Sequence, residues 1–283
     1  MNKILSFLTV LILFSVCISR DIGKLEYNKI TEGISKLTLK QNLNPIKKIN
    51  GKSKLVEFGE SHTADVGLPE LPTYTTFYQL NPYKEYEFNL IVNESHIETG
   101  IDIHPHQGSD DEIKYKINSD FYNSSQVYPI KNINISDRKK ARGIELVTIE
   151  VVPYIYHPKT KSLEVFSDIE IEVREVGNRT PENETVIKKS RIFEELFEDM
   201  IVNYESSTRE NEYQEPSILY ICGGSSINNS SFQDLLEWRH QQGYIVNAVT
   251  LSTTGSSASS IKNYIYNAYY NWDNPPEYVA LVG

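Results

Sequence analysis

The period of the hydrophobic pattern changes once along this chain, near residue 176, and this change constrains the fold more than any other feature. Before it, apolar residues alternate with polar ones, most clearly at Leu163, Val165, Ile169, Ile171 and Val173. A period of two is typical of an antiparallel strand with one solvated face. After it, apolar residues recur at helical spacing. The chain therefore divides into a β-rich part and a part that contains helices.

Residues 20–176 are predicted to form a β-rich domain, an antiparallel sandwich or barrel. Alternating runs also occupy Tyr86–Val92 and Val147–Val151. The segment Tyr156–Ser162 has the composition of a turn, so we predict one long hairpin over residues 143–174.

Residues 177–216 are predicted to connect two domains. A polar stretch with Pro181 is followed by an amphipathic helix over Ile192–Ile201, whose apolar face must dock on another element. Residues 205–216 have almost no apolar content, which predicts an exposed acidic linker.

Residues 217–283 have the pattern strand, helix, strand, helix, strand. The predicted strands are Ser217–Cys222, Tyr244–Leu251 and Tyr278–Val282. Short strands that alternate with helices indicate a parallel sheet, which binds ligands beyond the carboxyl ends of its strands. Gly283 lies at such an end, so we expect the catalytic part of the protein to follow it.

Spacing predicts the two helices of this unit. The first begins at Ser231 with a capping-box-like sequence and ends at Gly243. The second has an apolar stripe at Ile261, Tyr264, Ile265, Ala268 and Tyr269.

Residues 1–19 are predicted to be a secretory signal peptide. Lys3 precedes the apolar run Ile4–Phe14, which is short for a membrane span, and Cys17-Ile18-Ser19 offers small side chains for cleavage. An uncleaved anchor is the alternative. A lipoprotein signal is disfavoured because Val16 is bulky. We expect a secreted or cell-surface protein that meets the membrane only during export.

Removal of the signal would leave Cys222 as the remaining cysteine, so no disulfide is expected within the chain. A lone cysteine in an exported protein suggests a nucleophile. Cys222 ends an apolar strand, however, which favours a buried hydrophobic role.

The formal charge of −10 argues against nucleic acid or an anionic membrane as partner. Gly223-Gly224 follows a strand but lacks phosphate-loop spacing, and no GxSxG elbow occurs. A nucleotide- or flavin-binding α/β protein is therefore a minor alternative.

The histidines form no clear site. His104-Pro105-His106, with Asp102 nearby, has metal-ligand chemistry, but a solvated loop is the favoured interpretation. His240 lies at a helix end, where it complements the helix dipole. His62, His96 and His157 have no partner at an informative spacing.

The chain resembles gingipain-type cysteine peptidase precursors. In the α/β part the resemblance rests on Phe232–Tyr244, Ile261–Ile265 and Pro276–Gly283. In the β-rich part it rests on Gly67–Pro72, Arg142-Gly143, Tyr156-His157-Pro158, Leu163–Phe166, Ile192–Ile201 and Asn203-Tyr204.

The resemblance implies a secreted thiol endopeptidase with a caspase-like α/β fold, made as a zymogen with a β-rich propeptide. Its His-Cys dyad would lie beyond Gly283, because neither His240 nor Cys222 matches a catalytic position. No residue of this chain is therefore assigned to catalysis, cofactor binding or metal binding. The resemblance requires no cofactor and admits a structural calcium. Expected partners are protein or peptide substrates and an activating protease.

Arg209-Glu210 is the candidate processing bond, because Arg209 is the only basic residue of the predicted linker. An ordinary exposed arginine is the alternative. A competing function for the whole chain is a secreted, non-catalytic β-sandwich interaction module with a degenerate α/β domain.

Overall fold

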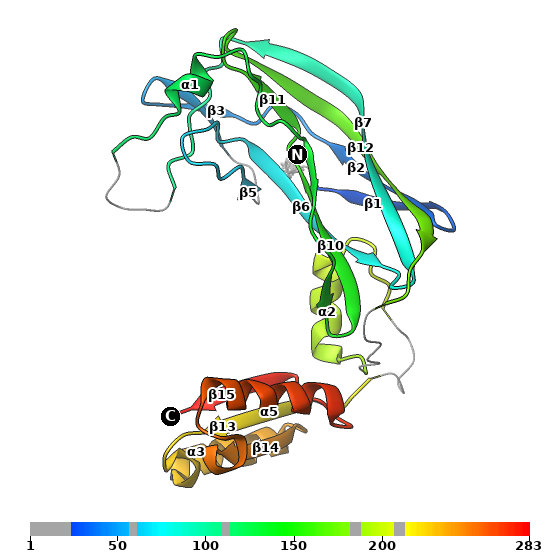
Figure 1. The fold of residues 1–283 in the computed structure, drawn as a ribbon, viewed down its shortest axis with the longest axis vertical. Coiled ribbons are helices and arrows are strands. Elements are labelled where there is room, and N and C mark those ends of the chain that lie inside the picture. The colour runs from blue at the N-terminus through cyan, green and yellow to red at the C-terminus, as the bar shows by residue number, and fades with distance from the viewer. Residues whose placement is uncertain (1–23, 57–60, 109–113, 182–187, 207–212) are drawn as a thin grey trace, which may run out of the picture.

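The computed structural model describes residues 24–56, 61–108, 114–181, 188–206 and 213–283. A curved β-rich domain arches over a smaller α/β unit, and one helix, α2 (Arg191–Met200), stands between them (Figure 1). The predicted signal peptide, residues 1–19, lies outside the described residues. No helix in the described ranges is both long and apolar enough to cross a membrane.

The first sheet of the β-rich domain is built around one long strand, β12 (Ser162–Asn178). On one side β12 pairs with β7 (Lys84–Thr99) along almost its whole length. On the other side it pairs with β2 (Ile34–Lys40) and then with β11 (Tyr154–His157), while β1 (Glu26–Thr31) pairs with β2. All these pairs are antiparallel.

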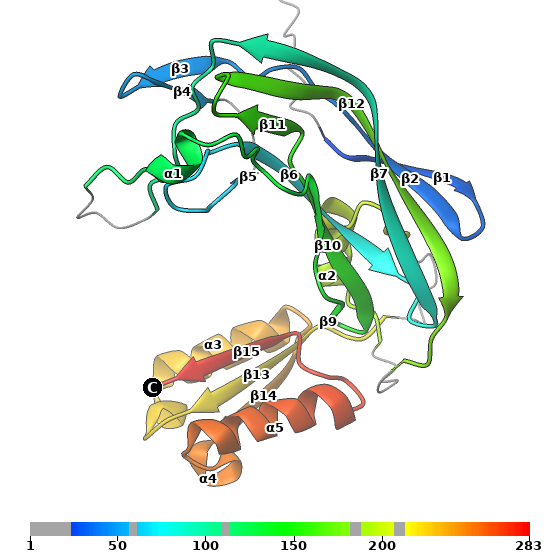
Figure 2. The same cartoon turned by 45° about the horizontal axis from the view of Figure 1, so that its top comes forward.

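The second sheet faces the first and is also antiparallel. Its central strands are β6 (Pro72–Leu80) and β10 (Ile144–Val151), with shorter strands at the edges: β5 (Ser61–His62), β8 (Ile133–Ile135) and β9 (Lys139–Ala141). A separate hairpin, β3 (Ile46–Ile49) and β4 (Lys52–Leu55), and the short helix α1 (Ser119–Tyr122) lie at the far end of the arch (Figure 2).

The apolar side chains of the alternating pattern fill the space between the two sheets. The predicted inward residues Ile169, Ile171 and Val173 of β12 are each 1% exposed. They belong to one core with residues of β2, β6 and β10: Leu37, Leu39, Tyr74, Tyr78, Val147, Ile149 and Val151. A second core surrounds Tyr154, Tyr156 and Leu163 near α1. The predicted antiparallel sandwich is confirmed.

The predicted long hairpin over residues 143–174 is wrong in its first half. β11 and β12 do form a hairpin, with Lys161 in the left-handed region at its turn. β10, however, pairs with β6 and β8 in the other sheet. Pro153 lies between β10 and β11, and because proline has no N–H it interrupts the ladder where the chain crosses between sheets.

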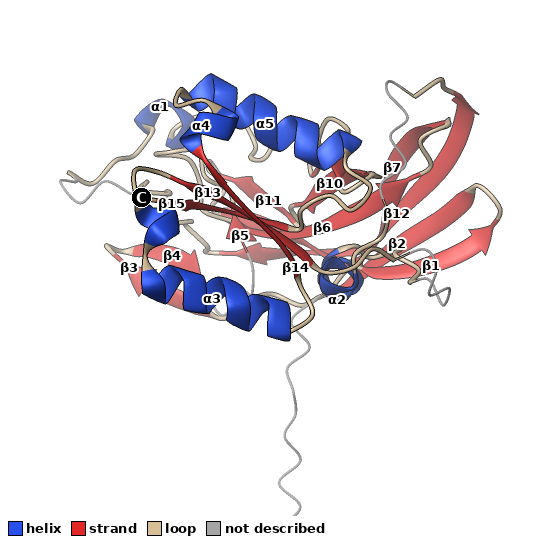
Figure 3. Ribbon diagram, turned by 90° about the horizontal axis from the view of Figure 1, so that it is seen from below, coloured by secondary structure: helices blue, strands red, loops and turns tan. Residues whose placement is uncertain are grey.

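The α/β unit is a three-stranded parallel sheet, as the sequence predicts, and its strand order is β14-β13-β15. The strands are β13 (Ser217–Cys222), β14 (Ile245–Thr250) and β15 (Tyr278–Val282). Helices α3 (Ser230–Gln241) and α5 (Ala258–Asn271) cover opposite faces of this sheet (Figure 3). Short helices follow β13 and β14: a 3-10 turn at Ser226–Asn228 and α4 (Leu251–Thr254).

The start of the first α/β helix differs from the predicted one. Asn229, not Ser231, caps α3, because its side-chain oxygen accepts the Phe232 N–H at 3.2 Å. A reciprocal capping box instead opens α5, between Ser257 and Ser260. Gly243 follows α3 with a φ of 88°, which confirms its predicted role as the stop.

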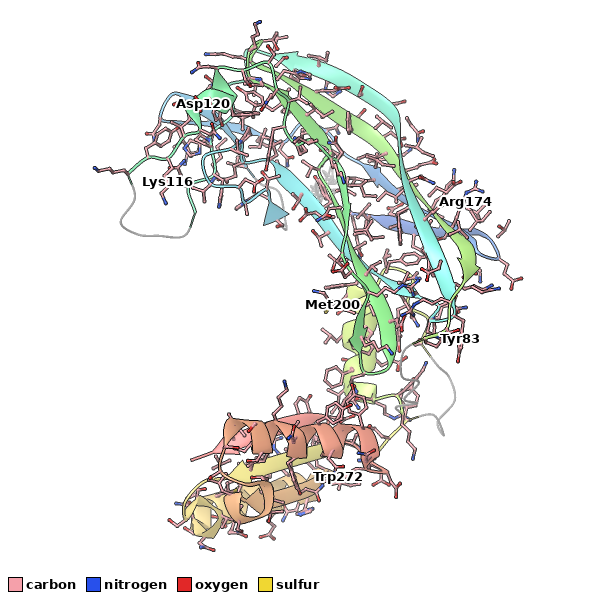
Figure 4. The ribbon with its side chains drawn as sticks, in the orientation of Figure 1. Tyr83, Lys116, Asp120, Arg174, Met200 and Trp272 are labelled. Carbon is pink, nitrogen blue, oxygen red and sulfur yellow. The ribbon has the colours of Figure 1, made fainter. Side chains whose placement is uncertain are left out.

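Replacing Tyr154 by phenylalanine is expected to destabilise the β-rich domain by about 1–2 kcal/mol. The ring of Tyr154 is fully buried, and its hydroxyl donates to Gln41 at 2.8 Å and lies 2.6 Å from Asn44 Oδ1. The substitution leaves the buried amide of Gln41 and the part-buried amide of Asn44 without that partner. Urea unfolding followed by circular dichroism measures the change. The control is Tyr83→Phe at the lower end of the domain, where Tyr83 is 51% exposed (Figure 4); an equal effect there would contradict the expectation.

Candidate functional site at the interdomain contact

The hairpin of β9 and β10 carries an arginine at its tip that reaches the α/β unit. Arg142 and Gly143 form the two-residue loop with φ values of 45° and 82°, the conformation that matches the twist of a hairpin. Arg142 Nη2 donates to Gln214 Oε1 at 2.9 Å. Its guanidinium also lies 4.9 Å from the ring centroid of Phe193 and 5.9 Å from that of Tyr269. One side chain of the β-rich domain thus contacts three segments.

Burial lowers the pKa of the Arg142 guanidinium, and Tyr269 and Glu277 oppose this shift. Because an arginine stays protonated in proteins, Arg142 carries its charge into this contact. Stacking on two aromatic rings gives that charge a favourable environment where water is scarce.

Helix α2 is fixed at both ends. Before its first turn, the Ser190 hydroxyl donates to Glu277, and the Phe193 ring lies 6.4 Å from the Tyr278 ring. After its last turn, the Val202 N–H donates to Phe77 O of β6 at 2.9 Å. The helix therefore joins the edge of β15 to the second sheet of the β-rich domain.

The prediction that the apolar face of α2 is buried holds only in part. Leu196 and Met200 are 45% and 42% exposed, while Phe193 and Phe197 are half-buried. The structure attaches this helix by its ends rather than along one face.

The predicted exposed linker, residues 205–216, is partly buried. Gln214 is 5% exposed, and its Nε2 donates to Pro275 O at 2.9 Å. Ser217 Oγ donates to the same carbonyl at 2.7 Å. The prediction of full exposure is wrong for Gln214. Composition shows that a segment is polar, but it does not show which polar side chains find hydrogen-bond partners inside the protein. The candidate processing bond, Arg209-Glu210, lies outside the described residues.

A cavity of about 880 Å³ opens between the hairpin, α2 and α5. Its wall is part polar and part apolar and carries groups of both charges, with Arg138, Lys140, Glu145, Glu194, Ile144 and Phe197 among the lining residues. The cavity lies in the contact between the two parts of the molecule.

Cys222 is a buried thiol, as the strand pattern predicts. It is 0% exposed and packs with Ile218, Tyr220 and Phe232. Burial raises the pKa of the thiol, and a hydrogen bond with Ser226 opposes the shift. A protonated thiol without solvent access is a poor nucleophile.

Cys222 and His240 do not come together. Cys222 pairs with Thr250 at the carboxyl end of β14, whereas His240 lies in the last turn of α3, just before β14 begins. A six-residue strand separates these levels by about 16–20 Å. His240 is exposed at the helix end, where it complements the dipole as predicted.

The favoured interpretation of His104-Pro105-His106 as a solvated loop is wrong. His104 is 5% exposed, and the side chain of His106 is 16% exposed. Backbone bonds hold the segment in place: Glu70 N–H donates to His104 O and His106 N–H to Leu68 O. Asp102 is bound to Lys52 at 2.5 Å and Lys161 at 3.1 Å, so it is not a free ligand. Burial raises the Asp102 pKa, but Lys52, Lys161 and Tyr156 outweigh it, and the net pKa is lowered.

Sequence reasoning missed the residues that make the interdomain contact. Arg142, Gln214 and Glu277 are polar and lie far apart in the chain, so no local spacing joins them. The one available signal for Arg142 was the Arg-Gly pair between two β-type segments, which marks a hairpin tip.

Comparisons with known proteins agree with this architecture. The family model "Propeptide_C25" matches residues 38–211, and "Peptidase family C25" matches residues 211–283. The boundary between the two matches falls between α2 and β13.

The similar proteins are distant. Gingipain R2 and Gingipain R1 of Porphyromonas gingivalis are each 21% identical to the chain, over 82% and 78% of its length. The chain spans about a third of Gingipain R2 and, in the two forms of Gingipain R1, 23% and 13% of their length.

One solved structure shares the fold. The complex of the P. gingivalis RgpB pro- and mature domains matches with a TM-score of 0.54 at 17% identity, over 65% of this chain and 98% of that one. The predicted fold, a β-rich prodomain followed by the first strands and helices of an α/β peptidase domain, is thus confirmed, and this chain belongs to the gingipain-type C25 family, as a C25 propeptide followed by the start of a C25 peptidase domain.

Proposed function

We propose that this chain is the N-terminal part of a secreted cysteine endopeptidase zymogen. Its prodomain, residues 20–176 with the connector 177–216, keeps the peptidase latent and assists its folding. Two hydrogen bonds carry the proposal, from Arg142 to Gln214 and from Ser190 to Glu277. Each joins the matched propeptide to the matched peptidase segment.

The peptide-cleaving chemistry in this proposal comes from a His-Cys dyad located after Gly283. The match of residues 211–283 to the peptidase family supports chemistry of this class. A thiolate paired with an imidazole attacks the peptide carbonyl, and backbone N–H groups stabilise the resulting oxyanion. The buried state of Cys222 agrees with a structural role for that residue.

Export by residues 1–19 places the protein outside the cell or on its surface in this proposal. The similarity to gingipains supports this location. The partners are then protein or peptide substrates and an activating protease. Structural calcium remains an expectation from the family resemblance.

Processing at Arg209-Glu210 tests the proposal. The protein encoded by the whole gene is expressed with Arg209 intact or as Arg209→Gln, and thiol-dependent peptidase activity is measured before and after treatment with an arginine-specific protease. Wild type is expected to acquire an N-terminus at Glu210 and to gain activity. Arg209→Gln should stay uncut there and lose most of that gain.

The matched control is Arg174→Gln, an arginine of the β-rich domain that is outside the linker and pairs with Glu172 at 2.6 Å. It should be processed like wild type. Full activity of the uncut precursor would contradict latency. Activation by cleavage of another bond would contradict only the assignment of Arg209-Glu210 as the processing site.

A further inference from the structure

Two imidazoles and a carboxylate converge in the prodomain, away from the interdomain contact. His62, Glu70 and His106 each offer one ligand atom, and these atoms all lie within 4.8 Å of one another. The His62 and His106 ring centroids are 4.9 Å apart. The Glu70 side chain is 5% exposed, so this is a nearly enclosed carboxylate.

Backbone pairing places the three residues on one face of a small β arrangement. His62 pairs with Pro72, and Pro69 pairs with Pro105 in an antiparallel bridge. Counting by twos along the middle segment puts Glu70 on the same face as Pro72. In this register Glu70 lies opposite His104, and His106, two residues further on, lies on the same face as His104. The convergence follows from the backbone, not from chance side-chain rotation.

The hydrogen bonds at the ring nitrogens suit metal binding. His62 Nδ1 lies 3.1 Å from its neighbour's carbonyl, Thr63 O, and such a contact with a backbone carbonyl fixes the orientation of a histidine ring. His106 Nδ1 is buried without a hydrogen bond and lies 3.5 Å from Glu70 Oε2. A cation between these atoms would satisfy His106 Nδ1.

Lys54 is the competing charge at this cluster. Its Nζ lies 2.6 Å from Glu70 Oε1, and its side chain is 31% exposed. Oε2 remains directed at His106, so the carboxylate can bind a metal through one oxygen while the other keeps its ion pair. The ammonium must nevertheless weaken any cation site at Glu70 by repulsion.

We propose that His62, Glu70 and His106 form a binding site for a divalent transition metal of the Zn²⁺ class, with water as the fourth ligand. Two imidazoles and one carboxylate form a ligand set that Zn²⁺ takes in tetrahedral geometry. Calcium prefers six to eight oxygen ligands, which this cluster does not supply. The metal would fasten the segment around His62 to those around Glu70 and His106.

Calorimetric titration of the full chain with ZnCl₂ tests the site, with Co²⁺ absorbance as a measure of coordination. Wild type is expected to bind one Zn²⁺, and Co²⁺ to give the visible bands of a four-coordinate ion. His62→Ala and His106→Ala should each weaken binding by more than the ~10–100-fold that loss of an outer-shell partner costs. Circular dichroism of each variant verifies its fold.

Two further variants separate this site from adventitious binding. Lys54→Met removes the competing ammonium, which is itself 31% exposed, and should tighten Zn²⁺ binding by about tenfold. His240→Ala removes an exposed histidine in the α/β unit and should leave the titration unchanged. Absence of Zn²⁺ binding by the folded chain, or equal binding by wild type and both histidine variants, overturns the proposal. These outcomes do not bear on zymogen latency.

Discussion

Replacing Glu145 by alanine is expected to lower the free energy of unfolding of the prodomain by about 3 kcal/mol. The Glu145 side chain is 3% exposed and lies 3.1 Å from Arg138, 3.0 Å from Arg179 and 3.5 Å from Lys140. Its loss leaves two guanidinium groups, each 21% exposed, with only the half-exposed carboxylate of Glu85 as a shared counter-charge, at 3.3 Å from Arg138 and 3.9 Å from Arg179. Their residual contact with water keeps the cost at the lower end for a broken buried pair. Both tryptophans, Trp238 and Trp272, lie in the α/β unit, so far-UV circular dichroism is the measurement for the prodomain.

The same group gives the prodomain a pH dependence of defined sign. Burial raises the pKa of Glu145, but the hydrogen bonds and charges of Arg138, Arg179 and Lys140 outweigh it, and the net pKa is lowered. Its stabilising contribution is therefore complete above the unfolded pKa of about 4.3 and is lost as pH falls through the lower folded value. The difference in stability between wild type and Glu145→Gln should shrink in acid below about pH 4.

Glu98→Ala is the matched control, because the Glu98 side chain is 43% exposed and its carboxylate lies 3.5 Å from Nε2 of His96, a half-exposed partner. It should change stability by less than about 0.5 kcal/mol. A stability of Glu145→Ala equal to that of wild type, or a difference that persists at low pH, would show that the carboxylate does not hold the two arginines.

Local patterns in the sequence were enough to predict the two longest strands of the prodomain, the three strands of the α/β unit and its two long helices. Alternation identified β12, because a strand between a core and solvent needs every second residue to be apolar. Gly243 marked the end of α3, because only a residue that tolerates positive φ fits there without strain. Such signals depend only on neighbouring residues, so they can be recognised in a single sequence.

Pairing between distant segments could not be predicted in the same way. β10 and β12 have the same alternation, and nothing in that alternation tells which sheet each joins. His62, Glu70 and His106 likewise come together only through backbone pairing of separate segments. Spacing along the chain reveals a metal site only when one helix or loop supplies its ligands.

Buried polar residues misled the composition argument in both parts of the molecule. The region around Gln214 looks like a solvated linker, and His104 looks like a solvated loop. Both are buried. Pro275 O accepts a hydrogen bond from Gln214, which replaces one that water would otherwise make, and the ring of Tyr115 packs against that of His104.

Glu277→Ala is expected to lower the unfolding free energy of the α/β unit by about 2 kcal/mol and to loosen its attachment to the prodomain. Glu277 is 8% exposed, accepts a hydrogen bond from the Ser190 hydroxyl before α2, and accepts the Ser217 N–H at 3.3 Å. Alanine leaves the donors of both serines in a buried position without that acceptor. Tryptophan fluorescence during urea unfolding measures this transition separately from the prodomain.

Two variants divide the effect of Glu277 between its partners. Ser190→Ala removes only the bond that crosses to α2 and should cost about 1 kcal/mol, leaving the bond to the Ser217 N–H in place. Glu237→Ala, on the exposed side of α3, should leave the transition within about 0.5 kcal/mol of wild type. If Glu277 joins the two domains, the double variant Ser190→Ala with Glu277→Ala must be destabilised by less than the sum of the two single losses, as measured by the tryptophan transition. Strict additivity of the two substitutions would instead mean that they act at separate places, because coupled neighbours show interaction energies of about 0.5–3 kcal/mol.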